Sequence, residues 1–301
     1  MNSALILQDV VYVVALLAIG YPLGCYIYKI YNGERVALMR IFAPLEQLLY
    51  RVMGVDEEQQ MHAKKYASSV LWFSLFGFLI VMGLHLVQAW LPLNPEQLEN
   101  TSVHLAYNTA ASFVSNTNWQ AYSGETTLSY LTQMAGLTVQ NFVSAATGIA
   151  VLFVLCRGFV RRETKNLGNF WSDLVKITLY ILLPLSVVVC LILVSQGVVQ
   201  TLDPYASYTT LEGTQGVLPL GPAASQIAIK QLGTNGGGFY GVNSAHPLEN
   251  PTGLSNLVEV VSILLIPAAL CFSFGKGIKD SRQGIAIFVA MGIMLVAALG
   301  S

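Results

Sequence analysis

The sequence predicts an all-α polytopic membrane protein, on the evidence of its composition and of the spacing of its charges. Hydrophobic residues make up 54% of the 301 residues and charged residues only 10%, whereas soluble domains carry about 25% charged residues. Charge-poor apolar segments of about 20 residues, the length that crosses the bilayer core, recur along the whole chain. A soluble globular domain is therefore excluded.

Six charge-poor segments predict six membrane-spanning helices. The first lies between Asp9 and Lys29 and is too long for the apolar region of a typical signal peptide, so we expect it to be retained. The fifth contains one acid, Glu259, which is either an ion relay or, as we favour, hydrated near the outer surface. The predicted spans cover residues 6–28, 66–91, 131–156, 174–196, 254–275 and 283–300.

The distribution of Lys and Arg predicts how these spans are oriented. Every Lys and Arg except Lys230 lies in the connections 29–65, 157–176 and 276–282, which fall on one side of the membrane. Cytoplasmic loops are enriched in basic residues, so we expect these connections in the cytoplasm and the N-terminus outside. The opposite side carries many acids with Lys230 as the sole counter-charge, and it should attract cations.

Two long external segments, 92–130 and 197–253, each predict a re-entrant pore loop. Each contains a stretch suited to a helix too short to span: 103–114, about 18 Å long, and 222–232, which Pro222 opens and Gly233 ends. A shift of 117 residues places Thr117 on Thr234. We expect four divisions. Residues 1–65 form an N-terminal span and cytoplasmic loop, and residues 66–160 and 161–276 each form a repeat of helix, pore loop and helix. Residues 277–301 begin a truncated third repeat.

Each pore loop carries a polar stretch, which we call the first signature (residues 115–120) and the second signature (residues 233–238). Irregular polar backbone at membrane depth normally lines a cavity. Carbonyl, amide and hydroxyl oxygens without thiols or charges suit a dehydrated alkali cation, so we expect potassium selectivity. The glycines at 236–238 allow carbonyls to point inward together. In the first signature, Asn116, Asn118 and Gln120 would contribute side-chain oxygens or brace the backbone.

Several single residues have alternative interpretations. Thr117 and Thr234 could add hydroxyl ligands at equivalent levels, although either signature could instead be a simple turn. Lys230 either anchors backbone carbonyls or gates the ion, or else it extends to the outer interface. We expect His85 to be a hydrogen-bonded packing residue and Asp173 to lie at a helix N-terminus beside Lys176.

Longer motifs resemble one family. They are the stretches 116–120, 122–130, 133–141 and 232–238, with His246-Pro247 and Glu249-Asn250-Pro251. The chain is similar to the KdpA family, the potassium-binding subunits of bacterial Kdp potassium-transporting P-type ATPases. The resemblance implies the superfamily of potassium transporters, with four helix, pore loop, helix repeats around one selectivity filter. Because only two such loops are present, we expect a fragment or a truncated product.

The resemblance also implies site residues and partners. Potassium would be bound by Asn116, Thr117, Asn118, Gln120, Gly233, Thr234, Asn235, Gly236 and Asn243, with Ser115, Lys230, Gly237 and Gly238 beside the pore. The potassium ion would be the only ligand, with no organic cofactor. The implied partners are the P-type catalytic subunit, the C-type small subunit, a small single-span subunit and the lipid of the bacterial cytoplasmic (inner) membrane, with no nucleic acid.

The chain lacks the motifs of an enzyme. It has no Walker lysine motif, no phosphorylatable Asp-Lys-Thr-Gly segment and no HExxH motif, so we do not expect it to hydrolyse ATP alone. Two other functions fit the pattern. One is a passive potassium channel or symporter subunit of the Trk or Ktr type, and the other is a truncated, non-conducting assembly partner.

Overall fold

A computed structural model describes residues 3–160 and 166–299, most of which are helical. Six helices in this part of the chain are long and apolar enough to cross a membrane. They confirm the six predicted spans and the all-α polytopic fold. Their bounds are Leu7–Tyr31, Ala63–Trp90, Thr132–Val160, Phe170–Ser195, Gly253–Gly277 and Ser281–Ala298.

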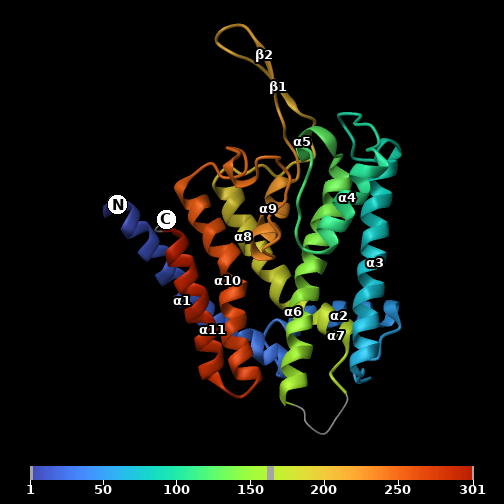
Figure 1. Cartoon of the computed structure of the whole chain (residues 1–301). Coiled ribbons are helices and arrows are strands. Elements are labelled where there is room, and N and C mark those ends of the chain that lie inside the picture. The colour runs from blue at the N-terminus through green and yellow to red at the C-terminus, as the bar shows by residue number, and fades with distance from the viewer. Residues whose placement is uncertain (1–2, 161–165, 300–301) are drawn as a thin grey trace. The chain divides into compact units, whose positions relative to one another are not determined.

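Three of the spans contain a short 3-10 or π-helical element, labelled η. Figure 1 labels the α-helices and β-strands. The elements are α1 (Ser3–Tyr31), α2 (Met39–Met53), α3 (Ala63–Val87), η1 (Gln88–Trp90), α4 (Val103–Val114), α5 (Gly124–Thr127), η2 (Thr132–Thr138), α6 (Val139–Val160), α7 (Phe170–Ile177), η3 (Thr178–Leu182), α8 (Leu183–Ser195), β1 (Ala206–Thr209), β2 (Gln215–Leu218), α9 (Ala223–Leu232), η4 (Asn243–Ala245), α10 (Gly253–Gly277) and α11 (Ser281–Leu299).

The chain forms two compact units, each assembled from separate stretches. Unit 1 comprises Met1–Val70, Ala146–Leu182 and Val260–Ser301, and unit 2 comprises Leu71–Ala145 and Leu183–Glu259. Because neither unit is one continuous stretch, the repeat boundaries given above remain predictions. The units are described separately below.

A buried ion pair organises part of unit 1. Arg157 binds both oxygens of Asp173, at 2.5 and 2.8 Å, and the Tyr66 hydroxyl donates to the same carboxylate at 2.9 Å. Asp173 lies in the first turn of α7, as predicted, but its partner is Arg157. Lys176 pairs with Glu57 instead, at 3.2 Å. A long-range pair of this kind is not visible from sequence spacing.

The helix α2 was not predicted, because its charges conceal it within a connection. It ends at Gly54, which adopts the left-handed conformation with φ +64°. Its inward side holds the buried residues Glu46 and Tyr50, where the Tyr50 hydroxyl donates to Glu46 at 2.7 Å. The opposite side is apolar and exposed, at Ile41, Leu45, Leu48 and Val52.

Two spans contain π-helical turns, η2 and η3. Pro184 follows η3 and has no amide hydrogen to donate to the carbonyl of Tyr180 four residues earlier. The Tyr26 hydroxyl donates to that carbonyl instead, at 2.9 Å. In η2 the Thr138 hydroxyl donates to the Gln133 carbonyl at 3.0 Å. Such turns are frequent at functional sites, and η2 lies directly before the polar face of α6 described below.

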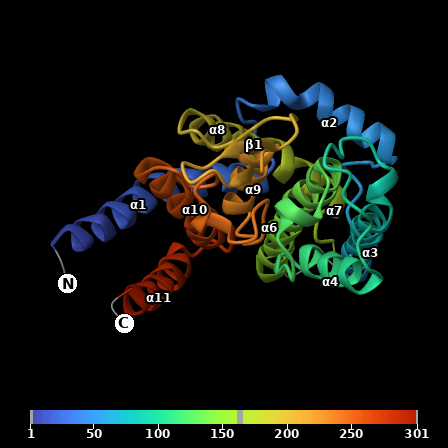
Figure 2. The same cartoon turned by 90° about the horizontal axis from the view of Figure 1, so that it is seen from above.

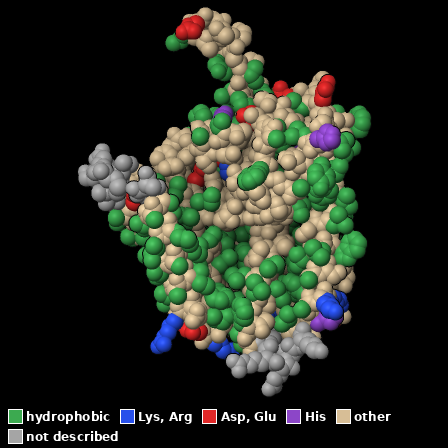
Figure 3. All heavy atoms as spheres, viewed as in Figure 1, with side chains coloured by type: hydrophobic (Ala, Val, Ile, Leu, Met, Phe, Trp, Pro, Cys, Tyr) green, Lys and Arg blue, Asp and Glu red, His purple; other side chains and the backbone are tan. Residues whose placement is uncertain are grey.

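Unit 2 contains the short helices α4 and α9 and one β-hairpin. Its core includes Val81, Ala110, Phe113, Leu128 and Leu137, all at most 1% exposed. The strands β1 and β2 are antiparallel, with Ala206 opposite Leu218, and form a hairpin that was not predicted. On the face shown in Figure 3, hydrophobic side chains cover the flank over α3. Exposed apolar residues such as Leu71 and Phe76 allow that flank to contact lipid.

Candidate potassium site

Two half-helices of unit 2 lead into the two signatures. The helix α4 ends at Val114 and α9 ends at Leu232, so both predicted half-helices are confirmed. Ser102 caps α4, its hydroxyl oxygen accepting a 3.2 Å hydrogen bond from the Leu105 amide. Figures 1 and 2 show α9 lying beside α8 within unit 2. Because a helix C-terminus carries about half a negative charge, both half-helices direct negative potential toward the signatures.

The backbone turns after the half-helices repeat at 118 residues, the separation of Gln120 and Gly238. The predicted shift of 117 residues is therefore wrong by one. Thr117 corresponds to Asn235, and Thr234 corresponds to Asn116, so the two threonine hydroxyls are not at equivalent levels. The matching amide-to-carbonyl bonds are Ser115 to Ala111, Asn116 to Phe113 and Thr117 to Ser112, and then Gly233 to Ile229, Thr234 to Gln231 and Asn235 to Lys230.

Alternate residues of each signature have positive φ. The angles are +63° at Asn116 and +58° at Asn118, and +54° at Thr234 and +94° at Gly236, again 118 residues apart. A residue with a side chain pays about 1–2 kcal/mol for this conformation, and such strain clusters at functional sites. The two signatures therefore share one strained backbone pattern at matching positions.

The two signatures touch each other directly. The Asn116 side chain donates to the Gly233 carbonyl at 3.1 Å. The Gln120 amide donates to the Gly238 carbonyl at 3.1 Å and accepts from the Gly238 amide at 2.9 Å. These bonds join backbone groups of the second signature to side chains of the first. The structure therefore brings together the two segments that the sequence suggested would act jointly.

A network of amide and hydroxyl groups on α6 supports both signatures. Asn118 donates to the Asn141 side chain at 2.6 Å, and Ser144 donates to the Asn116 oxygen at 2.7 Å. Asn235 also donates to the Asn116 oxygen, at 2.5 Å. Asn141 and Ser144 were missed as site residues. Their signal was uncharged polar side chains within a span, where each must find a partner.

Side chains alternate between the two sides of each signature. Asn118 and Asn235 are buried, at 2% and 3% exposure, whereas Thr117, Thr234 and Gly236 are exposed. Within the described residues, no hydrogen bond ends on the carbonyl oxygens of Thr117, Asn118, Asn235 or Gly236. The oxygen of Asn116 already has two donors, so it is less available to a cation than these carbonyls. Within residues 3–160 and 166–299, no group of three His, Cys, Asp or Glu side chains could hold a metal ion.

The glycines at 236–238 are needed for different reasons. Gly236 has a positive φ, and an added Cβ would lie 4.0 Å from the Thr117 carbonyl oxygen, an ordinary contact distance. At Gly237 a Cβ would lie only 2.0 Å from the Asn118 carbonyl oxygen. At Gly238 it would meet the Lys230 side chain at 2.7 Å. Close approach, and not only flexibility, therefore fixes two of the three glycines.

Lys230 is buried behind the second signature. It is 1% exposed and forms an ion pair with Glu249, which is fully buried. The interpretation in which Lys230 extends to the outer interface is therefore wrong. Its methylene chain packs on Gly238, whose amide and carbonyl both bind Gln120. In α4, Ser112 takes the equivalent position, so only the second half-helix carries a cation in its last turn.

Glu259 and Asn243 lie near this ion pair. Glu259 is 2% exposed and accepts from Gln231 at 2.7 Å, so the expected hydration at the outer surface is wrong. The same Gln231 amide donates to Ser244, the neighbour of Asn243, at 2.8 Å. The Asn243 side-chain oxygen is buried without a hydrogen-bond partner among the described residues. The structure gives Asn243 no hydrogen bond to either signature within the described chain.

Two histidines of unit 2, His85 and His246, lie against neighbouring groups of the fold. His85 is fully buried, and its Nδ1 lies 2.8 Å from the Val81 carbonyl oxygen one turn earlier, in agreement with a packing role. The His246 ring stacks on Tyr240 with centroids 4.1 Å apart. Burial lowers the pKa of His246 below its usual 6.5, although the Glu125 carboxylate opposes the shift. The shift favours the neutral form of the ring.

Comparisons with known proteins identify the family of the chain. The profile of the KdpA family, described as "Potassium-transporting ATPase A subunit", matches residues 10–301. Two relatives carry the name "Potassium-transporting ATPase potassium-binding subunit". The one from Clostridium botulinum (strain Alaska E43 / Type E3) is 59% identical, and the alignment covers 98% of this chain and 53% of the relative. The one from Listeria welshimeri serovar 6b is 60% identical, and the alignment again covers 98% of this chain and 53% of the relative. The chain thus spans about half the length of these relatives. The chain belongs to the KdpA family of potassium-transporting ATPase A subunits.

Proposed function

We propose that the chain is the potassium-binding and translocating part of an ATP-driven potassium uptake complex. The observation that carries this proposal is the direct contact of the two signatures at the C-terminal ends of α4 and α9. Carbonyl oxygens that lack donors lie on the strained backbone of both signatures, and such oxygens can replace the water around a potassium ion. The names of the relatives agree with potassium binding.

The predicted site residues then divide into two roles. Carbonyls of Thr117, Asn118, Asn235 and Gly236 contact the ion, and the Thr234 hydroxyl lies on the same exposed side. The side chains of Asn116 and Gln120, together with Gly233 and Gly238, hold the two backbones in register. Ser115 bonds to the Thr117 hydroxyl at 2.9 Å. Asn243 would contribute its buried side-chain oxygen, which has no hydrogen-bond partner among the described residues.

ATP hydrolysis would occur on a partner, the P-type catalytic subunit, because this chain carries no motif for it. The C-type small subunit and a small single-span subunit would complete the complex. The chain would lie in the bacterial cytoplasmic membrane with its N-terminus outside, as the basic connections predict. Extracellular potassium would enter at the signatures and pass to the catalytic subunit.

Replacement of Asn116 by leucine is expected to weaken rubidium binding about tenfold. The change removes an acceptor for Asn235 and Ser144 and a donor for Gly233, and unsatisfied buried donors cost about 1–3 kcal/mol each. Equilibrium binding of radioactive rubidium to the purified chain in nanodiscs measures the effect. The matched control is Asn108→Leu, at an exposed position of α4.

Rubidium binding and potassium uptake together distinguish the proposed function from the two alternatives. Thr117 or Gly236 substitutions should reduce the preference for rubidium over sodium while membrane insertion is retained. Parent-like selectivity in those variants would show that the filter assignment is wrong. Uptake that proceeds without a P-type subunit would support a passive channel or symporter, and a folded chain that binds no ion would support an assembly partner.

A further inference from the structure

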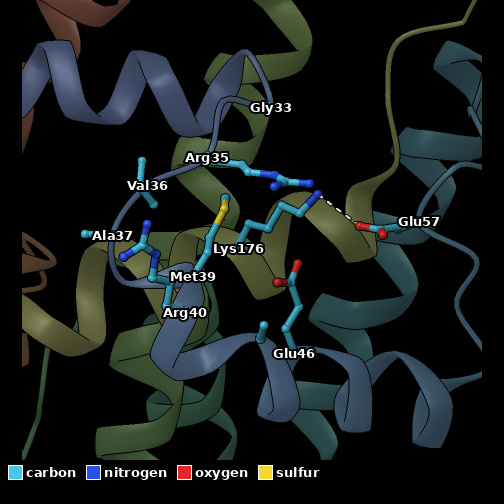
Figure 4. A pocket seen from close by; sticks show the side chains of 10 residues that line it. Gly33, Arg35, Val36, Ala37, Met39, Arg40, Glu46, Glu57 and Lys176 are labelled. Atoms are coloured by element: carbon cyan, nitrogen blue, oxygen red, sulfur yellow. Dashed lines mark hydrogen bonds and ion pairs between the residues drawn. The ribbon is translucent and has the colours of Figure 1, made fainter.

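Unit 1 contains a basic cavity that the potassium site does not use. Its volume is about 680 Å³, and its lining includes Arg35, Val36, Arg40, Glu46, Glu57 and Lys176 (Figure 4). The three cations come from three segments: Arg35 from the turn after α1, Arg40 from the first turn of α2, and Lys176 from the last turn of α7. Separate segments thus converge on one charged space.

The charges in this cavity are only partly balanced. Lys176 pairs with Glu57 at 3.2 Å, and Figure 4 shows Arg35 and Lys176 both extending toward Glu57. Glu46 is already satisfied, because its carboxylate accepts the hydroxyls of Tyr50 and Tyr180. Arg35 and Arg40 are exposed, and neither side chain has a hydrogen bond or ion pair with another described residue. Two guanidinium groups are therefore available to an anion.

An apolar stripe runs along α2 on the side opposite Glu46, and it begins at Ile41, the residue after Arg40 of the cavity lining. Ile41, Leu45, Leu48 and Val52 are 69%, 40%, 52% and 75% exposed. Their spacing of three and four residues places them on one side of the helix, over a length of about 16 Å. Helices with one apolar and one polar side lie in the membrane interface, with the apolar side among acyl chains. The polar side here is fixed to unit 1 through Tyr50, which lies 3.2 Å from the Ser172 hydroxyl.

We propose that this cavity binds the phosphate of an anionic phospholipid, with the acyl chains on the apolar stripe of α2. A phosphate accepts paired hydrogen bonds from a guanidinium group, and a phospholipid joins such a phosphate to apolar chains in one molecule. An apolar helix of a partner protein would leave Arg35 and Arg40 without a counter-charge. The basic connections are predicted to be cytoplasmic, where anionic lipids attract basic segments. The proposal does not depend on the potassium site.

Lipid retention by the purified chain tests the proposal. The chain is placed in nanodiscs of phosphatidylcholine and phosphatidylglycerol, released into neutral detergent, and its bound lipids are counted by native mass spectrometry. The parent should retain phosphatidylglycerol preferentially, and Arg35→Gln with Arg40→Gln should lower that preference about 25-fold, or about fivefold per arginine. The matched control is Arg51→Gln, an exposed arginine of α2 outside the cavity lining, which should retain the parent's preference.

The other outcomes are equally specific. Leu45→Gln with Leu48→Gln should reduce lipid retention while thermal stabilisation by inorganic phosphate stays as in the parent. Inorganic phosphate that displaces phosphatidylglycerol fully, at equal affinity, would mean a free-phosphate site and overturn the lipid proposal. Unchanged retention in the double arginine variant, or an equal loss in Arg51→Gln, would also overturn it. Thermal unfolding of each variant reports whether the chain remains folded.

Discussion

Gly237→Ala is expected to lower rubidium affinity by about 100-fold or more. The new methyl group would lie 2.0 Å from the Asn118 carbonyl oxygen and 2.9 Å from the Asn118 Cβ. Both contacts are with the first signature near its backbone, which cannot rotate away as the end of a flexible side chain could. Overpacking of this kind costs about 1–3 kcal/mol or more, and here the whole cost falls on the proposed ligands.

Two alanine variants provide matched comparisons. Gly148→Ala lies within α6, where an added Cβ meets nothing within 4 Å, so binding should be unchanged. Gly236→Ala has space but a φ of +94°, so we expect an intermediate loss of about tenfold from backbone strain. Rubidium titration of the three variants measures this order. Parent-like affinity in Gly237→Ala would contradict the observed approach of the two signatures.

Lys230→Met is expected to destabilise the chain by about 3–5 kcal/mol, because it leaves the Glu249 carboxylate buried without its cation. Glu249→Gln alone removes the ion-pair partner of Lys230 but leaves the Glu259 carboxylate nearby, so it should cost less. The double variant removes both charges and should recover most of the loss. Thermal unfolding in detergent, analysed as a double-mutant cycle, measures the coupling between the two residues.

The matched control for this ion pair is Lys176→Met. Lys176 and Glu57 are 25% and 50% exposed, so their pair should contribute no more than about 1 kcal/mol. A Lys230→Met variant as stable as Lys176→Met would show that the buried pair is not formed. The double variant should also recover rubidium binding only in part, because the Lys230 methylenes pack on Gly238.

Local patterns were sufficient to predict much of this fold. The spans follow from gaps between charges, and the half-helix α9 follows from Pro222 before it and Gly233 after it. Both signatures stand out because uncharged polar residues interrupt apolar sequence. Such signals depend on residues close together in the chain, and a sequence displays them directly.

Features that depend on distant residues could not be predicted. The repeat of 118 residues became visible only from backbone bonds and positive φ values, because the Thr-Asn pairs suggest 117. The burial of Lys230 depends on Glu249, and the role of Asn141 depends on Asn118 in another element. The helix α2 was hidden because charged residues such as Glu46 find partners only after folding.

The central claim is that backbone carbonyls of the two facing signatures hold the cation while asparagine side chains brace them from behind. A crystal structure of the chain soaked with rubidium, with anomalous scattering recorded at the rubidium edge, tests it most directly. The account predicts a rubidium peak in contact with carbonyl oxygens of Thr117 or Asn118 from one side and of Asn235 or Gly236 from the other. A peak bound only by side-chain oxygens, or one lying away from both signatures, would contradict it.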